Sequence, residues 1–560
     1  MNGSAEAALD GVYRIGVVGA GPKALFALES LVRRLLAAGG EVPRVAVDVI
    51  DTNPYAGSAY APDQPEYLRL NVSAGIVDAH EPGAAERFVP SFHQWAVEHA
   101  PQRDQESFPP RSTVGEYLHC AWNRVQEVCS DLQWNTVTAR AVDLTAVGGD
   151  SAEPRWVVHT ADGEQHGPYR QVLLATGHAP DHDGALKHTW SAEIPLVPQV
   201  YPVQQWLSQS KIPAGATVAV RGGALTFIDV CLALTQGRGG VFTTGEDANL
   251  RYIPSGQEPS RILPVTRSGL FLDAKSRPCV TVEDLDTVLD HARVRLAAQC
   301  TITEVINTVQ HAAAEILDRC TRSTASDAAW EVSYTARNGA EPGSERLNRA
   351  VRVFTRSIEV AEGRADPGAA WALGAAWAKL YPALVQAVSF RDLDAGDWAQ
   401  FRQMAVTMER LAFGPPLLNA RKIAALIQAG VVDALWMRQG VGIAATGITG
   451  LDESEPRPDV VIDAVLPPPG VVGTDQPMYL SLLERGTLTV PPGRRGVMVT
   501  PSGQALNSSG QAVAGLSVIG RPTEDHVLGH DTLNRALHTM PQEWAQAVVK
   551  HMTQGPGGTS

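Results

Sequence analysis

One stretch near the start of the chain constrains the fold more than any other, because it joins an apolar strand, a glycine-rich turn and a helix. Residues 15–18 (IGVV) form the strand, and the turn at 19–24 (GAGPKA) leads into the apolar pattern of a helix. Gly19 allows a tight turn, Gly21 lets the backbone approach a phosphate group, and Ala24 keeps the helix close to the strand. The N-terminus of such a helix presents unpaired N–H groups to an anion, so the stretch predicts a site for a dinucleotide pyrophosphate.

A second apolar strand, at residues 45–51 (VAVDVID), ends in an acidic residue. Asp51 is placed to bind a ribose hydroxyl, although it lies further beyond Ala24 than the usual ~20 residues. The linker at 36–44 accommodates the extra length. A glycine turn without a ligand is the simpler alternative, but two strands in the correct order favour the dinucleotide.

The size and charge of the chain limit its architecture and its partners. With 560 residues it exceeds one ordinary core, so we expect roughly two to four domains. Its 46 basic and 60 acidic side chains give a formal net charge of −14. Nucleic acids and anionic membranes attract basic surfaces, so we expect neither as a partner. The oligomeric state stays open.

The cysteines and the N-terminus indicate a cytoplasmic protein. The six cysteines are scattered without a CxxC pair, so we expect neither a disulfide framework nor a redox pair. The first residues lack the charged and apolar regions of a signal peptide. No apolar run approaches the ~18 residues of a membrane span, so none is expected.

A second glycine turn follows a second apolar strand further along the chain. Residues 218–220 form the strand, and Gly222, Gly223 and Ala224 follow in the turn. A flavoprotein that takes hydride from a nicotinamide needs two such turns, one for each cofactor. Ala224 stands where the second glycine is expected, and its Cβ lies where backbone and pyrophosphate nearly touch. Two interpretations stay open, a working nicotinamide site or a vestigial, purely structural turn. Asp229 in the following helix is expected to tether that helix to a loop.

The remaining sequence alternates strand and helix patterns. Residues 134–147 and 154–161 predict a small β-meander, and 237–269 predicts an irregular hairpin ahead of a strand that ends near Arg267. Helical patterns dominate from about 282 to 430. The last part returns to strands, which we expect at 459–467, 493–503 and 515–522.

The chain resembles a known family, the FAD/NAD(P)-binding proteins related to flavin-dependent N-hydroxylating monooxygenases. The likeness is carried by segments in a fixed order: GAGPKAL (19–25), YAGSAYAPDQPEYLRLNV (55–72), FPPRSTVGEYL (108–118), LLATGHAP (173–180), GGALTFIDVCLALTQGRGG (222–240), YIPSGQEP (252–259) and TRSG (266–269). Two later segments, IDAVLPPP (462–469) and VIGRPTE (518–524), are a weaker match to returning flavin strands.

The resemblance implies cofactor-binding residues. In the first turn, Gly19, Gly21 and Ala24 would hold the FAD pyrophosphate, and Asp51 would hold the adenosine ribose. The other implied positions are Ala175, Thr176 and Gly177 at the domain crossover, Asn71 and Arg111 near the flavin, Gly520 in the returning strands, and Gly222 and Ala224 at the nicotinamide turn. For Arg111, a surface salt bridge is an equal alternative.

Arg267 follows the strand after the second turn and bears on the choice of nicotinamide. A guanidinium at this point pairs with a 2′-phosphate, which favours NADPH. An arginine that is simply exposed fits the same position, so NADH stays open.

The histidines do not predict a metal site. His178, beside the turn at 175–177, is expected to be a hydrogen-bonded structural residue. The segment 520–531 gathers acidic and imidazole side chains, namely Glu524, Asp525, His526, His530 and Asp531. It lacks the spacing of a metal site, so we interpret it as a loop that closes the flavin or substrate site. No motif identifies a catalytic residue.

These observations predict an α/β fold with two Rossmann-like dinucleotide-binding domains, for FAD and NAD(P)H, and an inserted, mainly helical subdomain. We expect the FAD domain at 1–195 and 441–560. The NAD(P)H domain, with its hairpin and helical insertion, is expected at 196–360, and the helical subdomain at 361–440.

The resemblance implies an NAD(P)H-dependent FAD monooxygenase that hydroxylates the amine of a small amino-acid-like substrate through a flavin C4a-hydroperoxide. The substrate amine and O₂ are the expected partners, and repeated oxidation to nitroso or nitro products stays open. One alternative is a flavin oxidase or dehydrogenase without a stable hydroperoxide. Another is a non-catalytic FAD-binding protein, which the altered turn at 222–224 would fit.

Overall fold

The computed structural model describes residues 12–39, 42–53, 57–85, 87–101, 107–129, 132–148, 154–246, 248–276, 285–298, 301–321, 325–344 and 348–554. Contacts divide the chain into two compact units. Unit 1 comprises Met1–His182, Val388–Asp392 and Pro467–Ser560, and unit 2 comprises Asp183–Ala387 and Leu393–Leu466. Each unit is therefore built from segments that are distant in sequence.

Unit 1 is built on a six-stranded sheet in the order β16-β17-β7-β1-β2-β3. Its parallel strands are β1 (Val12–Val18), β2 (Arg44–Ile50), β3 (Gln133–Val137), β7 (Gln171–Leu174) and β17 (Ala512–Val518). Strand β16 (Gln504–Leu506) is the antiparallel edge. The last four residues of both β1 and β2 are buried, as expected for parallel strands that are covered on both faces.

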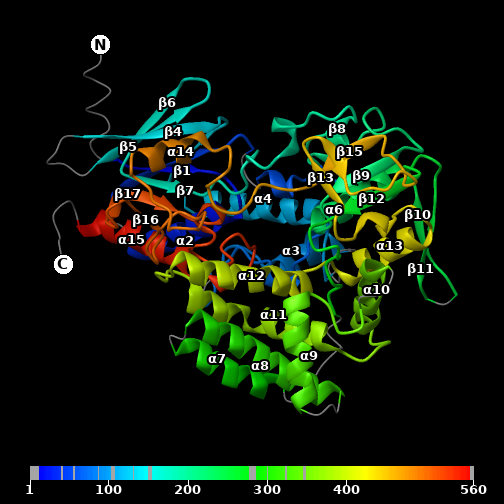
Figure 1. Ribbon diagram of the computed structural model, residues 1–560. Helices are drawn as coiled ribbons and strands as arrows, with labels where there is room; N and C mark the ends of the chain where they lie inside the picture. The colour runs from blue at the N-terminus through cyan, green and yellow to red at the C-terminus, as the bar shows by residue number, and fades with distance from the viewer. Residues whose placement is uncertain are drawn as a thin grey trace. The chain divides into compact units, whose positions relative to one another are not determined.

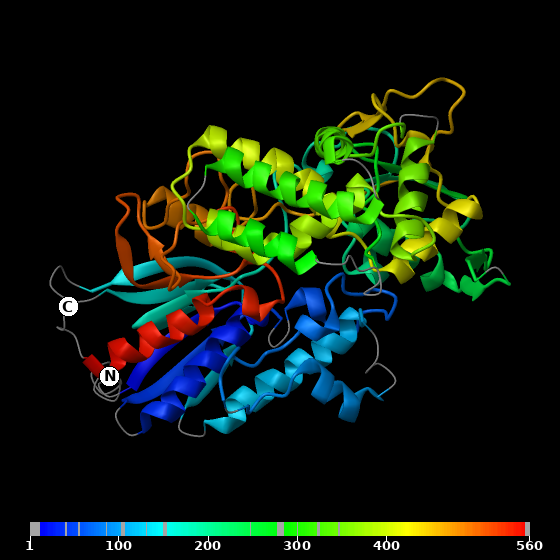
Figure 2. The same ribbon diagram turned by 90° about the horizontal axis from the view of Figure 1, so that it is seen from below.

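Helices cover one face of this sheet. Helix α2 (Pro22–Ala38) packs against α15 (Met540–Gln554) and α4 (Arg111–Val128), and α3 (Phe92–His99) packs against α4. Figure 2 shows α2, at the blue end of the colour scale, beside the red α15. The first and last helices of unit 1 thus share one apolar layer with the sheet.

A three-stranded antiparallel meander, β4-β5-β6, packs on the sheet as well (Figure 1). Its strands are β4 (Ala141–Val147), β5 (Arg155–Thr160) and β6 (Gln165–Tyr169). The ring of Tyr169 fills the space above Gly16, where a Cβ would come within 2.8 Å of it. The Tyr169 hydroxyl donates to Asp48 at 2.8 Å.

Unit 2 contains a four-stranded parallel sheet in the order β12-β9-β15-β8. The strands are β8 (Leu196–Val197), β9 (Thr217–Arg221), β12 (Arg261–Val265) and β15 (Val460–Asp463). Helix α6 (Leu225–Leu234) follows β9, and the hairpin of β10 (Val241–Thr244) and β11 (Leu250–Ile253) precedes β12 as predicted. A smaller hairpin joins β13 (Gly442–Ala444) to β14 (Gly447–Thr449).

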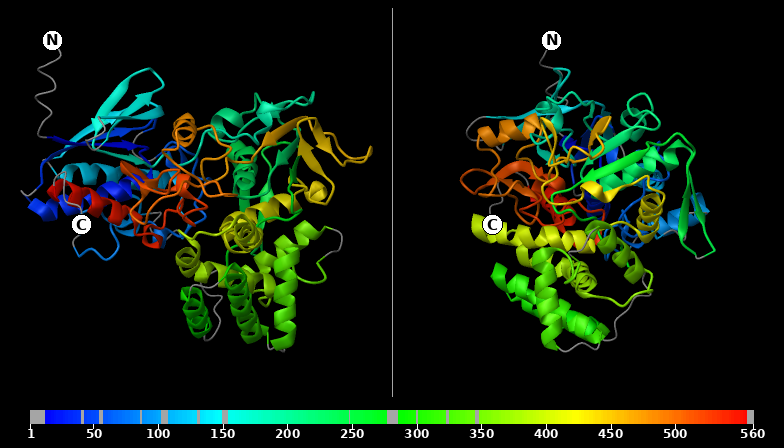
Figure 3. Two further views of the ribbon diagram at one scale, coloured as in Figure 1. Left: turned by 60° about the vertical axis from the view of Figure 1, so that its left-hand side comes forward. Right: turned by 45° about the vertical axis from the view of Figure 1, so that its right-hand side comes forward.

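The rest of unit 2 is mainly helical. Its helices are α5 (Val203–Trp206), α7 (Leu285–Ala297), α8 (Ile302–Thr321), α9 (Ala325–Asn338), α10 (Arg349–Ala361), α11 (Ala369–Val388), α12 (Ala395–Ala412) and α13 (Leu417–Gln428). Helices α7, α8 and α9 lie side by side (Figure 3). Within the described residues, no helix is both long enough and apolar enough to cross a membrane.

The structure corrects the expected domain boundaries. The segment predicted as a returning flavin strand at 459–467 forms β15, which pairs with β8 and β9 in unit 2. Unit 1 therefore ends its first segment at residue 182 instead of 195, and resumes at 467 instead of 441. The predicted helical subdomain at 361–440 is not a separate unit, because α13 packs on α6 and Ile262 pairs with Val432 beside β12.

Two strand predictions also differ from the structure. Strand β3 joins the main sheet beside β2 instead of the meander, although β4 and β5 form the meander as predicted. Residues 493–503 contain no strand, only a bridge between Val499 and Ala505.

A buried arginine ties the C-terminal segment of unit 1 to its first helix. Arg535 is 2% exposed and donates to Glu29 at 2.7 Å and to Ser30 at 2.6 Å. It also donates to the main-chain carbonyls of Phe26 and Ala79. Such a pair is costly to break, because the remaining partner stays buried with its charge.

We expect Arg535→Met to lower the free energy of unfolding by about 3 kcal/mol, because Glu29 would remain buried, paired with Arg33 but no longer with Arg535. Urea unfolding followed by tryptophan fluorescence measures the change. The matched control is Arg485→Met, whose partner Asp143 lies in an exposed pair that contributes about 1 kcal/mol or less. Equal losses of unfolding free energy in both variants would contradict the assignment of Arg535 and Glu29 as a stabilising buried ion pair.

Candidate functional site

The turn between β1 and α2 combines one glycine that the chain requires with one that leaves open space. Gly19 has a φ of +100°, and a Cβ there would come within 2.3 Å of the Ala175 carbonyl oxygen. Gly21 has an ordinary φ of −77°, and nothing lies within 4 Å of the position of a Cβ. Backbone geometry therefore demands glycine at 19, whereas the space at 21 is available to a ligand.

No side chain of the cap or the first turn compensates the unpaired N–H groups at the N-terminus of α2. Its cap residue, Gly21, provides no side-chain hydrogen bond, and the first turn contains no acidic residue. The first N–H groups of a helix lack partners within the helix, and its dipole places partial positive charge there. This end of α2 can therefore accept an anion.

Asp51 is fixed beside this turn. Its carboxylate accepts from the N–H of Ala20 at 2.7 Å and from the N–H of Asn53 at 2.8 Å. The Gly19 N–H donates to the carbonyl of Ile50 at 2.9 Å, which anchors the turn to the end of β2. Asp51 is thus held next to the helix N-terminus by the main chain itself.

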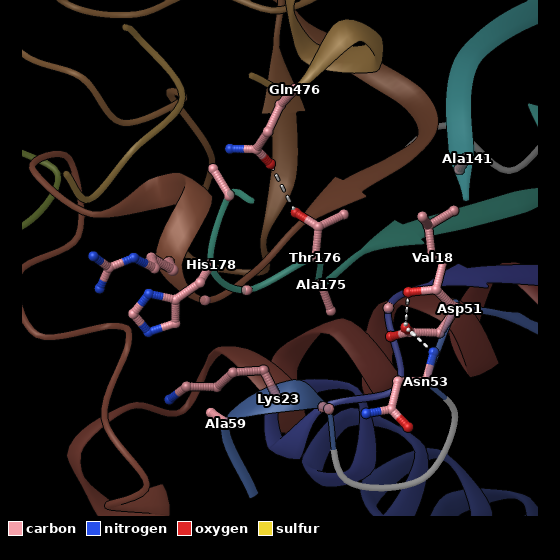
Figure 4. Close-up of a pocket in the computed structure, with 18 of the residues that line it drawn as sticks. Val18, Lys23, Asp51, Asn53, Ala59, Ala141, Ala175, Thr176, His178 and Gln476 are labelled. Atoms are coloured by element: carbon pink, nitrogen blue, oxygen red, sulfur yellow. Dashed lines mark hydrogen bonds between the residues drawn. The ribbon is translucent and has the colours of Figure 1, made fainter. Parts of the chain in front are cut away.

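A cavity of about 410 Å³ in unit 1 brings these groups together (Figure 4). Seven of the predicted cofactor residues line it: Gly19, Gly21, Asp51, Ala175, Thr176, Gly177 and Gly520. Ala24 lies in the buried core, where it serves helix packing, and Asn71 and Arg111 are not part of the lining. Lining residues that the sequence analysis did not single out for binding include Lys23, Asn53, Tyr60, Arg140, Gln476, Tyr479 and Arg521.

The turn after β7 closes one side of the cavity. Ala175 N–H donates to the carbonyl of Val18 at 2.8 Å, and the Thr176 hydroxyl contacts Gln476 at 3.3 Å and Tyr479 at 3.1 Å. Gln476 and Tyr479 belong to the start of α14 (Pro477–Glu484) and its cap. Gly177 has a φ of +67° and open space where a Cβ would lie. No motif marks the α14 segment in the sequence, so only the fold reveals it.

Arg111 lies beside the cavity without lining it. It is the first residue of α4, and its N–H donates to the Leu68 carbonyl at 2.8 Å. Gly115 of the same helix lets α4 pack directly on Tyr60, because a Cβ would come within 1.8 Å of the Tyr60 carbonyl oxygen. Burial raises the pKa of Tyr60 to about 12, and the charge of Arg111 opposes that shift.

The segment 520–531 contributes Gly520, Arg521 and Asp531 to the cavity. Arg521 pairs with Asp531 at 2.7 Å. The carboxylate of Glu524 accepts from the N–H groups of Gly529 and His530, each at 2.7 Å. Burial, followed by repulsion from Asp531, raises the pKa of Glu524 to about 8.

The imidazoles of this segment are used within the fold. His526 contacts the Val499 carbonyl at 3.0 Å, and His530 contacts the Thr523 hydroxyl at 2.7 Å. His178, in contrast, is exposed where it lines the cavity. In the described part of the chain, no group of three or more His, Cys, Asp or Glu side chains is placed to hold a metal ion.

The second turn, in unit 2, has the same hydrogen-bonding register as the first. The Gly222 N–H donates to the Val265 carbonyl at 2.9 Å, as Gly19 does to Ile50. Gly222 has a φ of +118°. Ala224 caps α6 with a φ of −91°, close to the −77° of Gly21, so this position needs no glycine for its backbone. The Cβ of Ala224 is therefore the main steric change at the second turn.

The residues around the second turn differ in charge from those around the first turn. Thr266 directly follows the strand residue that anchors the glycine, as Asp51 does in unit 1, and its methyl group would lie 2.3 Å from a Cβ on Gly223. Arg267 is exposed, and none of the described residues forms a hydrogen bond or ion pair with its side chain. Tyr201 donates to Asp229, so this carboxylate tethers α6 to a loop as predicted.

Comparison with known proteins agrees with this geometry. Residues 16–179 match the family model for FAD-NAD(P)-binding. The chain is 28% identical over 294 residues to an L-aspartate N-monooxygenase (nitrosuccinate-forming) of Streptomyces davaonensis, over 47% of this chain and 44% of that protein. A protein of the same name from Streptomyces cremeus is 30% identical over 290 residues, covering 46% and 42%. The matched region thus spans less than half the length of these relatives.

Two solved structures share the fold. The reduced form of ornithine hydroxylase from Pseudomonas aeruginosa has a TM-score of 0.51 at 12% identity, over 97% of this chain and 100% of that one. L-lysine 6-monooxygenase from Pseudomonas syringae has a TM-score of 0.51 at 12% identity, over 96% and 99%. These likenesses confirm the predicted α/β fold with Rossmann-type units, and the family match at residues 16–179 agrees with the predicted resemblance to FAD/NAD(P)-binding proteins. At residues 16–179, the chain therefore carries a domain of the FAD-NAD(P)-binding family.

Proposed function

We propose that this protein is an FAD monooxygenase that uses NAD(P)H and O₂ to hydroxylate the amine of an amino-acid substrate. The observation that carries the proposal is the pair of glycine turns at 19 and 222, each anchored by the same hydrogen bond and each followed by an uncapped helix. A hydride-accepting flavoprotein needs two such sites, whereas a protein with one dinucleotide needs only one.

The residues of the unit 1 cavity fit FAD. Asp51 is held where a ribose hydroxyl would bind, and the open space at Gly21 leads to the uncompensated N-terminus of α2, which suits a pyrophosphate. The volume of about 410 Å³ falls within the ~300–1,000 Å³ of typical ligand sites. When bound, FAD would accept hydride and activate O₂, which protein side chains cannot do.

The chain's own residues bind and orient the cofactor and its partners. The turn at 175–177, which Gln476 and Tyr479 hold in place, borders the cavity and carries no charged side chain of its own. An uncharged wall of this kind helps to exclude water and to keep a substrate amine unprotonated, which is the nucleophilic form. Hydroxylation at nitrogen requires that lone pair.

The second turn supports NAD(P)H as the reductant. Ala224 keeps the backbone conformation that a pyrophosphate site requires, at the cost of one methyl group near the ligand. Arg267, after β12, supports NADPH because a guanidinium pairs with a 2′-phosphate where a carboxylate would bind a 2′-hydroxyl. The acidic residue of the first site is replaced by Thr266 here, which favours the same choice.

L-Aspartate is the first substrate to test, because two related proteins are L-aspartate N-monooxygenases that form nitrosuccinate. Their names also support repeated oxidation of one amine to nitroso or nitro products. The fold is shared with an ornithine hydroxylase and a lysine 6-monooxygenase, so basic amino acids form the second group to test. Among the described residues, no disulfide involves any of the four described cysteines, which fits a reducing, cytoplasmic location.

Anaerobic mixing with NADPH tests the reductive step. We expect the flavin absorbance to bleach, and in air we expect mass spectrometry to detect an NADPH-dependent product of L-aspartate that carries added oxygen. Failure of both NADPH and NADH to bleach the flavin would support a non-catalytic FAD-binding protein instead. Oxygen consumption without an oxygenated product from any amino acid would favour a flavin oxidase.

Gly21→Val tests the first turn. A Cβ at this position meets no protein atom within 4 Å, so the branched side chain would occupy the space left for the ligand, and we expect colourless protein with the thermal unfolding midpoint of FAD-free wild type. Flavin content is read from the absorbance of the purified protein. Gly75→Val, at an exposed position outside the cavity, is the matched control and should stay yellow. Full flavin occupancy in Gly21→Val would refute the site.

Arg267→Ala tests the choice of nicotinamide. Loss of a charged hydrogen bond costs about 1.5–3 kcal/mol of binding free energy. We therefore expect the KM for NADPH to rise by about 10-fold or more while the KM for NADH stays constant. Steady-state oxidation of each cofactor measures both values. Arg352→Ala, on an exposed face of α10, is the control. An equal effect on both cofactors would remove Arg267 from the 2′-phosphate site.

A further inference from the structure

The cavity of unit 1 is lined by a cation, Lys23, that forms no ion pair within the described part of the chain. Lys23 lines the cavity from the first turn of α2, and the described residues form no hydrogen bond or ion pair with its ammonium group. Its one direct neighbour of note is the ring of Phe26, 5.8 Å from the ammonium nitrogen. A largely buried charge without a partner is costly, so a ligand group is the natural partner.

The nearest acids are already engaged. Glu524 and Asp531 both act on the charge of Lys23, yet neither forms an ion pair with it. Asp531 pairs with Arg521 at 2.7 Å, and Glu524 accepts two main-chain N–H bonds. The protein therefore keeps these carboxylates away from the ammonium group instead of neutralising it.

The direction of the side chain separates Lys23 from the ribose end of the cavity. Figure 4 shows Lys23 extending away from Asp51 and Asn53, toward the side of the cavity where His178 lies. Its stem passes beneath Gly520, where a Cβ would come within 3.0 Å of the Lys23 Cγ. Glycine at 520 thus leaves room for the side chain of Lys23 to take this path.

A dinucleotide that lies with its ribose at Asp51 and its pyrophosphate at Gly21 has its second nucleoside beyond the glycine turn. We infer that Lys23 is the electrostatic partner of the flavin ring system, and that it stabilises the negative charge the ring gains on reduction. This inference rests on the proposed function, because it requires FAD in this cavity.

The charge balance explains why a cation matters there. Hydride transfer from the nicotinamide delivers two electrons and one proton, so the ring system gains one negative charge unless it takes up a further proton. A nearby ammonium group stabilises that charge more strongly in a poorly hydrated cavity than in water. Burial lowers the pKa of Lys23 to about 8, and an adjacent anion would favour its protonated form.

The test is the midpoint potential of the bound flavin in Lys23→Met, measured by slow reduction with a reference dye. Methionine keeps an unbranched stem beneath Gly520 and removes the charge. We expect the equilibrium constant for reduction to fall at least tenfold, which is about 30 mV for a two-electron couple. Lys23→Arg should retain most of the wild-type potential. Lys550→Met, which removes an exposed lysine of α15 in the same unit, should leave it unchanged.

Two other outcomes overturn the inference. An unchanged potential in Lys23→Met would show that the ammonium does not act on the ring. Loss of flavin from Lys23→Met and from Lys23→Gln, with retention in Lys23→Arg, would assign the charge to the pyrophosphate. Wild-type protein that binds no FAD would instead refute the proposed function, so the two failures are distinguishable.

Discussion

The hydrogen bond from a glycine N–H to the end of the neighbouring strand is the constraint on which both candidate sites depend. In unit 1 it joins Gly19 to Ile50, and in unit 2 it joins Gly222 to Val265. Both glycines have a positive φ, which side-chain-bearing residues rarely adopt, so the bond and the glycine require each other. The turn it closes directs the N-terminus of the following helix toward the carboxyl edge of the sheet, where an anion can bind.

The same bond explains why the altered second turn is intact as a structure. The sequence has alanine at 224 where glycine is expected. From the sequence alone, it is not possible to say whether this alanine changes the backbone conformation of the turn or only adds a methyl group to it. The dihedral angles separate them, because Ala224 and Gly21 both have a negative φ that any residue adopts. What distinguishes the two sites is chemistry at the next strand end, where Asp51 is a carboxylate and the second unit has Thr266 followed by Arg267.

Local sequence patterns predicted the parts of the fold that local interactions determine. The first strand-turn-helix, the hairpin at β10–β11 and the meander strands β4 and β5 all follow from short-range periodicity and turn residues. Strand β15 was assigned to the wrong unit because a short run of four buried residues carries no information about its partners. The α14 wall of the cavity was missed for the same reason, since Gln476 and Tyr479 reach Thr176 only through tertiary packing.

The glycines of the first turn alone do not indicate the role of Lys23, which lies in the same motif. In the sequence it is an unremarked residue of the turn, and a lysine near a phosphate site would normally be assigned to the phosphate. Its stem instead passes beneath Gly520, and its ammonium group extends away from Asp51 while Arg521 and main-chain N–H groups occupy the nearby acids. On the proposed function the pyrophosphate binds at the N-terminus of α2, which leaves Lys23 for the part of the cofactor whose charge changes during turnover. Other charged side chains line the site, but Arg521 and Asp531 pair with each other, so on the proposed function Lys23 is the cation that is left to set how readily the cofactor accepts electrons.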